Sequence, residues 1–96
     1  MMNERDAVEA VAAAVHATDP SATVTVTARE SLDAQHGRRV TIGVLARPNH
    51  HELVDALVKF CVESAGDFRL ERSALAEMGE VTVDIIEVSA TVYTKI

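Results

Sequence analysis

The 96-residue sequence contains few of the residues that build cross-linked, metal-centred or aromatic-rich proteins. Its single cysteine, Cys61, cannot form an intramolecular disulfide, and a four-cysteine zinc site is excluded as well. Aromatic residues make up only 3% of the chain and tryptophan is absent, so the core must consist mainly of Val, Ala, Leu and Ile. Only four glycines are present, and they form no glycine-rich loop that would bind a phosphate.

The charge and the length of the apolar runs exclude further classes. Nine Lys and Arg are outnumbered by fifteen Asp and Glu, and Arg38–Arg39 is the one adjacent basic pair, whereas a nucleic-acid backbone needs clustered cations. No stretch approaches the roughly 20 apolar residues that cross a bilayer, and residues 1–6 do not resemble a secretory signal. We therefore expect no nucleic-acid or membrane partner. The expected location is the cytoplasm, or a particle assembled inside the cell.

The first half of the chain shows a change of hydrophobic period. Residues 4–17 place apolar side chains at i, i+3, i+4 and i+7, which predicts an amphipathic helix. Residues 23–28 alternate threonine and valine, and residues 40–46 also alternate, so two strands are expected, antiparallel across the polar loop between them. Gly43 has no side chain within the second of these strands. It marks either a bulge or the close approach of a group packed above it.

A second helix is expected after Pro48 and before Gly66. Its apolar arc is wide, which predicts burial against the sheet on one side and against something else on another. Residues 67–79 fit either a short strand, because Phe68 and Leu70 alternate with charged residues, or one to two helical turns.

The carboxyl-terminal segment, residues 80–96, contains no Gly, Pro or Asn and is rich in β-branched residues. Its apolar residues alternate in one phase up to Ile85 and in the other from Ile86, which predicts a β-bulge in one long strand. A tight hairpin is the alternative, but its usual turn residues are missing. Residues 81–96 would extend roughly 50 Å at about 3.3 Å per residue, against a diameter of about 30 Å for a compact chain of this size. The strand must therefore bend or project, and projection would offer an apolar edge to a neighbour.

These elements predict one α+β domain spanning residues 1–96. We expect two layers: an antiparallel sheet of about three to five strands with two main helices on one face, in the order α-β-β-α-(β/α)-β. Thr23, Thr25 and Thr27 would then face solvent or a partner.

No constellation of residues indicates catalysis, so an enzyme is not expected, and neither is a cofactor. His51 and Asp55 are spaced i, i+4 on the second helix, and His36 from the loop would be a third ligand. However, the adjacent His50 and His51 point about 100° apart, and nothing in the spacing makes three ligands converge. We expect a solvated first helical turn and no metal, with His36, His51 and Asp55 as weak candidates.

The sequence is most consistent with a non-catalytic interaction or assembly module that works through the edge of its last strand. The order of the elements is similar to that of small tail-terminator proteins of phages, which assemble as rings, and this likeness implies an oligomeric structure of phage tail or neck type. The expected contact residues are Ile86, Val88, Val92, Tyr93 and Ile96. The alternative is that these five residues complete the internal core.

Two other functions remain open. One is a small-molecule or metal-binding protein that uses His36, His50, His51 and Asp55. The other is an acidic protein inhibitor that docks on a basic partner, whose binding would weaken strongly with salt.

Overall fold

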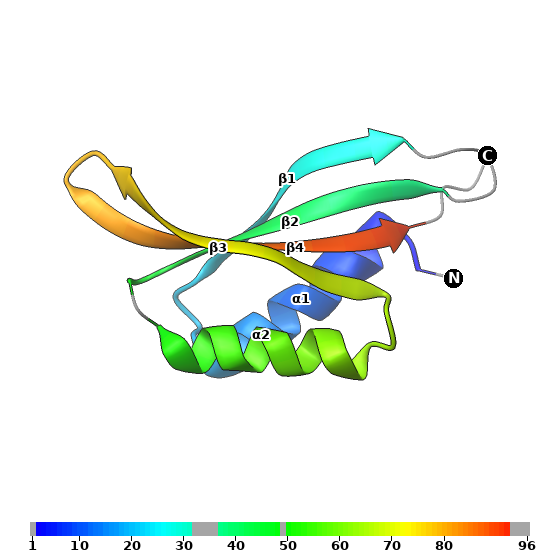
Figure 1. Ribbon diagram of the computed structural model, residues 1–96, viewed down its shortest axis with the longest axis horizontal. Coiled ribbons are helices and arrows are strands. Elements are labelled where there is room, and N and C mark those ends of the chain that lie inside the picture. The colour runs from blue at the N-terminus through cyan, green and yellow to red at the C-terminus, as the bar shows by residue number, and fades with distance from the viewer. Residues whose placement is uncertain (1, 32–36, 49, 93–96) are drawn as a thin grey trace.

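The computed structural model describes residues 2–31, 37–48 and 50–92. The elements are, in chain order, α1 (Glu4–Thr18), β1 (Thr23–Ser31), β2 (Arg38–Ala46), α2 (His51–Glu63), β3 (Phe68–Met78) and β4 (Val81–Val92). The strands form one antiparallel sheet in the order β1-β2-β4-β3, and both helices lie on the same side of it (Figure 1). The predicted two-layer α+β architecture is confirmed, and the stretch left open between strand and helix is the strand β3.

Helix α1 begins where the sequence supplies a cap. The Asn3 side chain accepts a hydrogen bond from the backbone N–H of Asp6 at 2.8 Å, which satisfies one of the unpaired amides of the first turn. The helix ends before Asp19, whose backbone N–H donates to the carbonyl of Val15 at 2.8 Å. The face that α1 turns to the sheet consists of Ala7, Val11 and Val15.

Helix α2 buries Leu53 and Leu57 completely, but its apolar arc is wider than the core can cover. Helix α1 packs against α2 and supplies part of the second covering surface that the sequence predicts, but Val58 remains 42% exposed and Val62 75% exposed. Neither of the described helices is long and apolar enough to cross a membrane.

The core lies between the helices and the inner face of the sheet. Strand β4 contributes Ile86, Val88 and Val92, which are 0%, 0% and 1% exposed. These are three of the five predicted contact residues, and their side chains are enclosed because they face the helix layer. For these three residues, the alternative that they complete the internal core agrees with their observed burial. Tyr93 and Ile96 lie outside the described residues.

Strand β4 is central and offers no free edge along Asp84–Val92, which corrects the predicted docking edge at Ile86, Val88 and Val92. It pairs with β2 on one side and with β3 on the other. The predicted bulge at Ile85–Ile86 is also wrong, because the register between β2 and β4 runs without a shift from Ala46↔Asp84 to Arg38↔Val92. The two apolar phases are the two faces of one regular strand.

Register shifts occur instead in the two edge strands. In β1 the shift lies between Val26 and Ala28, and in β3 it lies between Leu70 and Arg72. The β1 bulge explains Gly43, because a Cβ built on this glycine would lie 2.6 Å from Cγ2 of Thr27. The close approach predicted for this position is therefore present.

The β3–β4 hairpin projects beyond the rest of the sheet. Strand β2 ends at Ala46, opposite Asp84, so residues 81–83 of β4 pair with β3 alone. Gly79, with φ +66°, supplies the left-handed conformation for the tight turn between the two strands. The resulting arm, at the left of Figure 1, lengthens the molecule to 43 × 28 × 18 Å. Of the two predicted outcomes for the long strand, projection is the one observed, but the projecting strand is paired.

Candidate functional site

The face of the sheet opposite the helices carries a line of apolar side chains, which we call the outer strip: Leu45, Ile85, Val83 and Val81. Leu45 and Ile85 are directly opposite each other on β2 and β4, and such pairs point to the same face of a sheet. Val83 and Val81 follow on the same face of β4 at alternate positions and continue onto the arm.

The outer strip becomes more exposed towards the tip of the arm. Leu45, Ile85 and Val83 are half-buried, whereas Val81 is 60% exposed. The threonines of β1, Thr23, Thr25 and Thr27, are exposed, in line with the prediction that they face solvent or a partner. The outer strip is thus a partly covered apolar surface on a hydrogen-bonded, regular scaffold.

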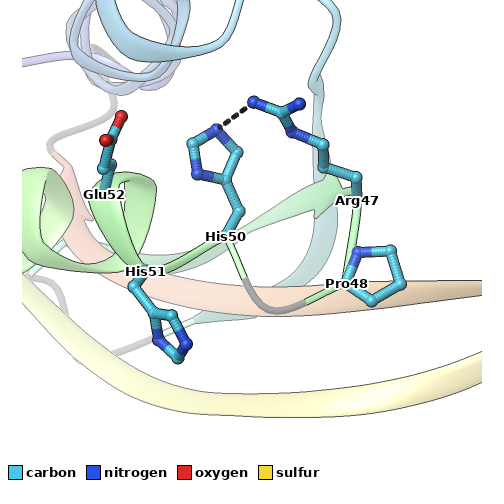
Figure 2. Close-up of a pocket in the computed structure, with 5 residues that line it drawn as sticks. All are labelled: Arg47, Pro48, His50, His51 and Glu52. Atoms are coloured by element: carbon cyan, nitrogen blue, oxygen red, sulfur yellow. Dashed lines mark hydrogen bonds between the residues drawn. The ribbon is translucent and has the colours of Figure 1, made fainter.

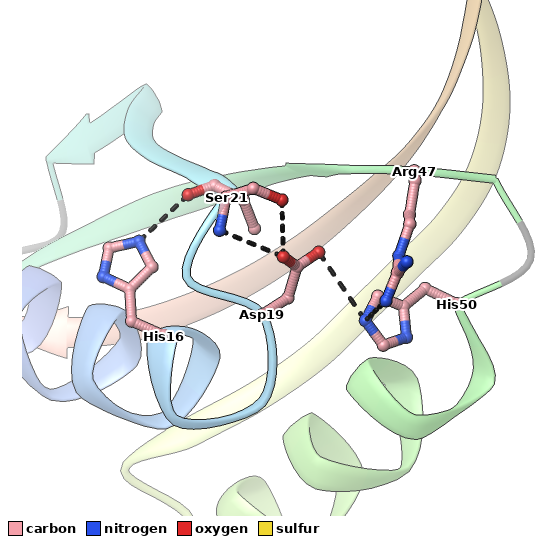
Figure 3. Close-up of polar contacts among 6 residues, drawn as sticks. His16, Asp19, Ser21, Arg47 and His50 are labelled. Atoms are coloured by element: carbon pink, nitrogen blue, oxygen red, sulfur yellow. Dashed lines mark hydrogen bonds and ion pairs between the residues drawn. The ribbon is translucent and has the colours of Figure 1, made fainter.

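A second feature is the polar cluster at the end of the molecule where the α1–β1 loop meets the start of α2 (Figure 3). Asp19, the residue after α1, is only 5% exposed. Its Oδ1 accepts from the backbone N–H of Ser21 at 3.0 Å and from the Ser21 hydroxyl at 2.6 Å. The Ser21 hydroxyl is the main reason why the pKa of Asp19 lies below its usual value, and the nearby His50 and Arg47 lower it further, against the opposing effect of burial.

The other carboxylate oxygen of Asp19 faces His50. Oδ2 lies 3.6 Å from Nε2 of His50, and it is buried without a hydrogen-bond partner. The same nitrogen of His50 lies 3.3 Å from a guanidinium nitrogen of Arg47. Because the guanidinium only donates, this contact requires an unprotonated Nε2, whereas an ion pair with Asp19 requires a protonated one. The two contacts therefore require different placements of the proton on the His50 ring.

His16 is held separately. Its Nε2 lies 2.9 Å from the carbonyl oxygen of Ala22, and because a carbonyl only accepts, this nitrogen carries the proton. The bond ties the last turn of α1 to the start of β1, so His16 has a structural role in the loop.

A pocket of about 450 Å³ opens beside this cluster, lined by Arg47, Pro48, His50, His51 and Glu52 (Figure 2). His50 is 8% exposed and turns inward to Arg47, whereas His51 is exposed and points away from it. The two imidazoles therefore do not converge, as their helical offset predicts. The residues that line the pocket include one guanidinium, one exposed imidazole and one carboxylate.

The structure describes two of the three weak metal candidates. His51 and Asp55 are both exposed on α2, and His36 lies outside the described residues. Among the residues that the structure describes, no three His, Cys, Asp or Glu side chains are placed to hold a metal ion. Cys61 is partly buried against the core, and this burial raises the pKa of its thiol.

The buried contact between Asp19 and His50 was not predicted from the sequence. In the sequence, Asp19-Pro20 ends the first helix and Pro48 precedes the second. This pattern does not show that the two loops lie next to each other. Comparisons with protein-family models, with curated proteins and with solved structures found no match.

Proposed function

We propose that this chain is a non-catalytic protein–protein interaction or assembly module, a subunit of an oligomeric structure of the ring type found in phage tails or necks. It would act in the cytoplasm or in a particle assembled inside the cell. The observation that carries the proposal is the outer strip, which ends on the projecting arm with Val81 60% exposed.

Apolar surface that stays exposed to water carries a free-energy cost. Burying such surface contributes about 25 cal/mol per Å², so a partner that covers the outer strip is stabilised in proportion to the apolar area that it buries. The arm is a two-stranded ribbon that extends past the body of the sheet, so it can reach a neighbouring subunit. Val58 and Val62 on α2 add a second uncovered apolar site on the other layer.

The proposal is tested by light scattering coupled to size exclusion at two concentrations, with the wild-type chain and the variant Val81→Asp. We expect the wild-type protein to have a mass above that of one chain. In Val81→Asp the dissociation constant should rise at least about tenfold, because a carboxylate would have to be desolvated at the contact.

Thr82→Asp is the matched control, since it adds the same charge at an exposed position on the opposite face of the same arm. It should associate like the wild-type protein. If Val81→Asp and Thr82→Asp associated equally well, the outer strip would not be the contact surface. A wild-type chain that stayed monomeric at the higher concentration would overturn self-assembly.

A second candidate is binding of a small molecule, and the observation that favours it is the pocket beside Arg47. The Arg47 guanidinium suits a ligand with a carboxylate or phosphate group. This function predicts that citrate or inorganic phosphate raises the melting temperature of the wild-type protein but not that of Arg47→Ala. Equal shifts in both proteins would exclude the pocket as the binding site.

A further inference from the structure

We propose that two copies of this chain join edge to edge through β3, around a two-fold axis perpendicular to the sheet, with Glu71 of each copy opposite Arg72 of the other. This inference rests on the proposed assembly role and names its partner: a second copy of the chain.

The outer edge of β3 is available for pairing. In the described part of the chain, β3 pairs with β4 only, over Phe68–Met78, and Arg69, Glu71, Arg72 and Ser73 are all exposed. An edge strand of this length presents a row of unpaired backbone groups to a neighbour. It contains no proline that would prevent continuation of the ladder.

The bulge in β3 restricts the register of such pairing. Leu70 is opposite Val88 and Ser73 is opposite Ile86, and both of these β4 residues are buried in the core, so Leu70 and Ser73 belong to the helix-covered face. Glu71 and Arg72, between them, both belong to the open face. The 2.6 Å hydrogen bond from the Ser89 hydroxyl to Glu71 agrees with this assignment, since Ser89 alternates with the inward residues of β4.

A two-fold axis between Glu71 and Arg72 matches this pattern to itself. Antiparallel pairing then places Glu71 opposite Arg72 of the second copy and Leu70 opposite Ser73, so outward residues meet outward residues across both bulges. Of the registers that pair the strand through its bulge, this one keeps the faces matched, since a slip of one residue opposes inward and outward positions.

The charges favour the same register. It places two opposite-charge pairs on the two-fold axis, one Glu71–Arg72 contact on each side, and it places no like charges directly opposite each other. Cross-strand pairs of opposite charge stabilise an antiparallel ladder, whereas like charges destabilise it. A two-fold, self-complementary contact is also the commonest way in which identical chains associate.

The dimer would form one continuous eight-stranded sheet with the helices of both copies on the same side. Helix α2, which packs beneath β3, then lies next to its counterpart, and this is the helix with the exposed Val58 and Val62. The open faces of the two copies become continuous, which combines both outer strips into one surface for the further contacts of the assembly.

The test uses two charge-reversal variants, Glu71→Arg and Arg72→Glu, analysed by native mass spectrometry and by size exclusion with light scattering. Each variant alone opposes like charges on the axis, so each should lose β3-mediated pairing, with a dissociation constant raised at least about tenfold. Mixed in equal amounts they restore both opposite-charge pairs. The mixture should therefore form a heterodimer that neither variant can imitate alone.

Glu30→Arg on β1, the other edge of the sheet, is the matched control and should associate like the wild-type protein. The heterodimer also demonstrates that both variants are folded, and their melting temperatures provide a second check. Association that persists unchanged in both single variants, or a mixture that fails to pair, overturns the β3 dimer and leaves the proposed assembly role standing. A monomeric wild-type chain overturns both, and loss of association in Glu30→Arg alone would transfer the contact to β1.

Discussion

Gly43 allows a sharp test of how the edge strand β1 lies over β2. The glycine is buried in β2, and the Thr27 side chain covers it from the bulge of β1. In Gly43→Ala the new Cβ would lie 2.6 Å from Cγ2 of Thr27, far inside the usual 3.5–4.0 Å contact between carbons. Thr27 cannot simply rotate without a loss, because its hydroxyl donates to the carbonyl of Thr41 at 3.3 Å.

Two opposing effects set the magnitude. Overpacking costs about 1–3 kcal/mol, whereas replacing a strand glycine by alanine returns about 0.5–1 kcal/mol of backbone entropy. We expect Gly43→Ala to lower the free energy of unfolding by about 1 kcal/mol, the difference between these two ranges. For a chain of this size that is a fall in melting temperature of about 4–8 °C.

The double-mutant cycle with Thr27→Ser isolates the contact, since serine keeps the hydroxyl and removes Cγ2. In the Thr27→Ser background, Gly43→Ala should stabilise the protein by about 0.5 kcal/mol, because only the entropy gain remains. Urea denaturation followed by circular dichroism measures all four proteins. If Gly43→Ala cost the same in both backgrounds, the contact with Thr27 would not be the reason for a glycine at this position.

Three further outcomes are expected. Ile86→Ala, at a fully buried core position, should lower the free energy of unfolding in urea by about 2–5 kcal/mol. The neighbouring Ile85→Ala, on the open face, should lower it by about 1 kcal/mol. Equal losses would contradict the assignment of faces. The lowered pKa of Asp19 means that its hydrogen bonds stabilise the fold above about pH 4 and that this stability is lost as the pH falls through the folded-state pKa. The difference in the free energy of unfolding between wild type and Ser21→Ala should therefore shrink on acidification. A difference that stayed constant would refute this. Because burial raises the pKa of the Cys61 thiol, its alkylation by iodoacetamide at neutral pH, followed by mass spectrometry, should be slower than that of the unfolded chain, and equal rates would contradict it.

The sequence predicts the local elements well because their periods are unambiguous. The 3.6-residue spacing of α1 corresponds to one buried face, and the threonine–valine alternation of β1 corresponds to one half-buried face. The phase change at Ile85–Ile86 was misread because alternation cannot distinguish an inserted residue from a regular strand that is apolar on both faces. The outer face of β4 also carries apolar residues, namely Val81, Val83 and Ile85, although no helix covers it. A strand that is covered on one side only is expected to be apolar on that side alone, so this strand departs from the usual pattern.

Strand order and loop contacts depend on long-range packing, and no local pattern encodes them. The last strand of the chain is inserted between β2 and β3, so a segment that looks like an added edge is the centre of the sheet. The contact of Asp19 with His50 likewise depends on how α1 packs against α2. Neither residue carries a motif, and Asp19 in sequence is only the aspartate before a proline at the end of a helix.

The central position of β4 also decides which experiments can identify the contact surface. Truncation after Ser89 removes Ala90 and Val92, which are 2% and 1% exposed, and with them the pairing of β4 with Arg38–Val40 of β2. Burial of a valine alone contributes about 1.5–3 kcal/mol, and a domain of this kind has about 5–15 kcal/mol of total stability. The truncated chain should therefore show a large loss of cooperative unfolding by circular dichroism, and any loss of association would follow from unfolding. Exposed positions on the outer strip and on the β3 edge can be changed without removing core side chains, so substitutions there distinguish a lost contact from a lost fold.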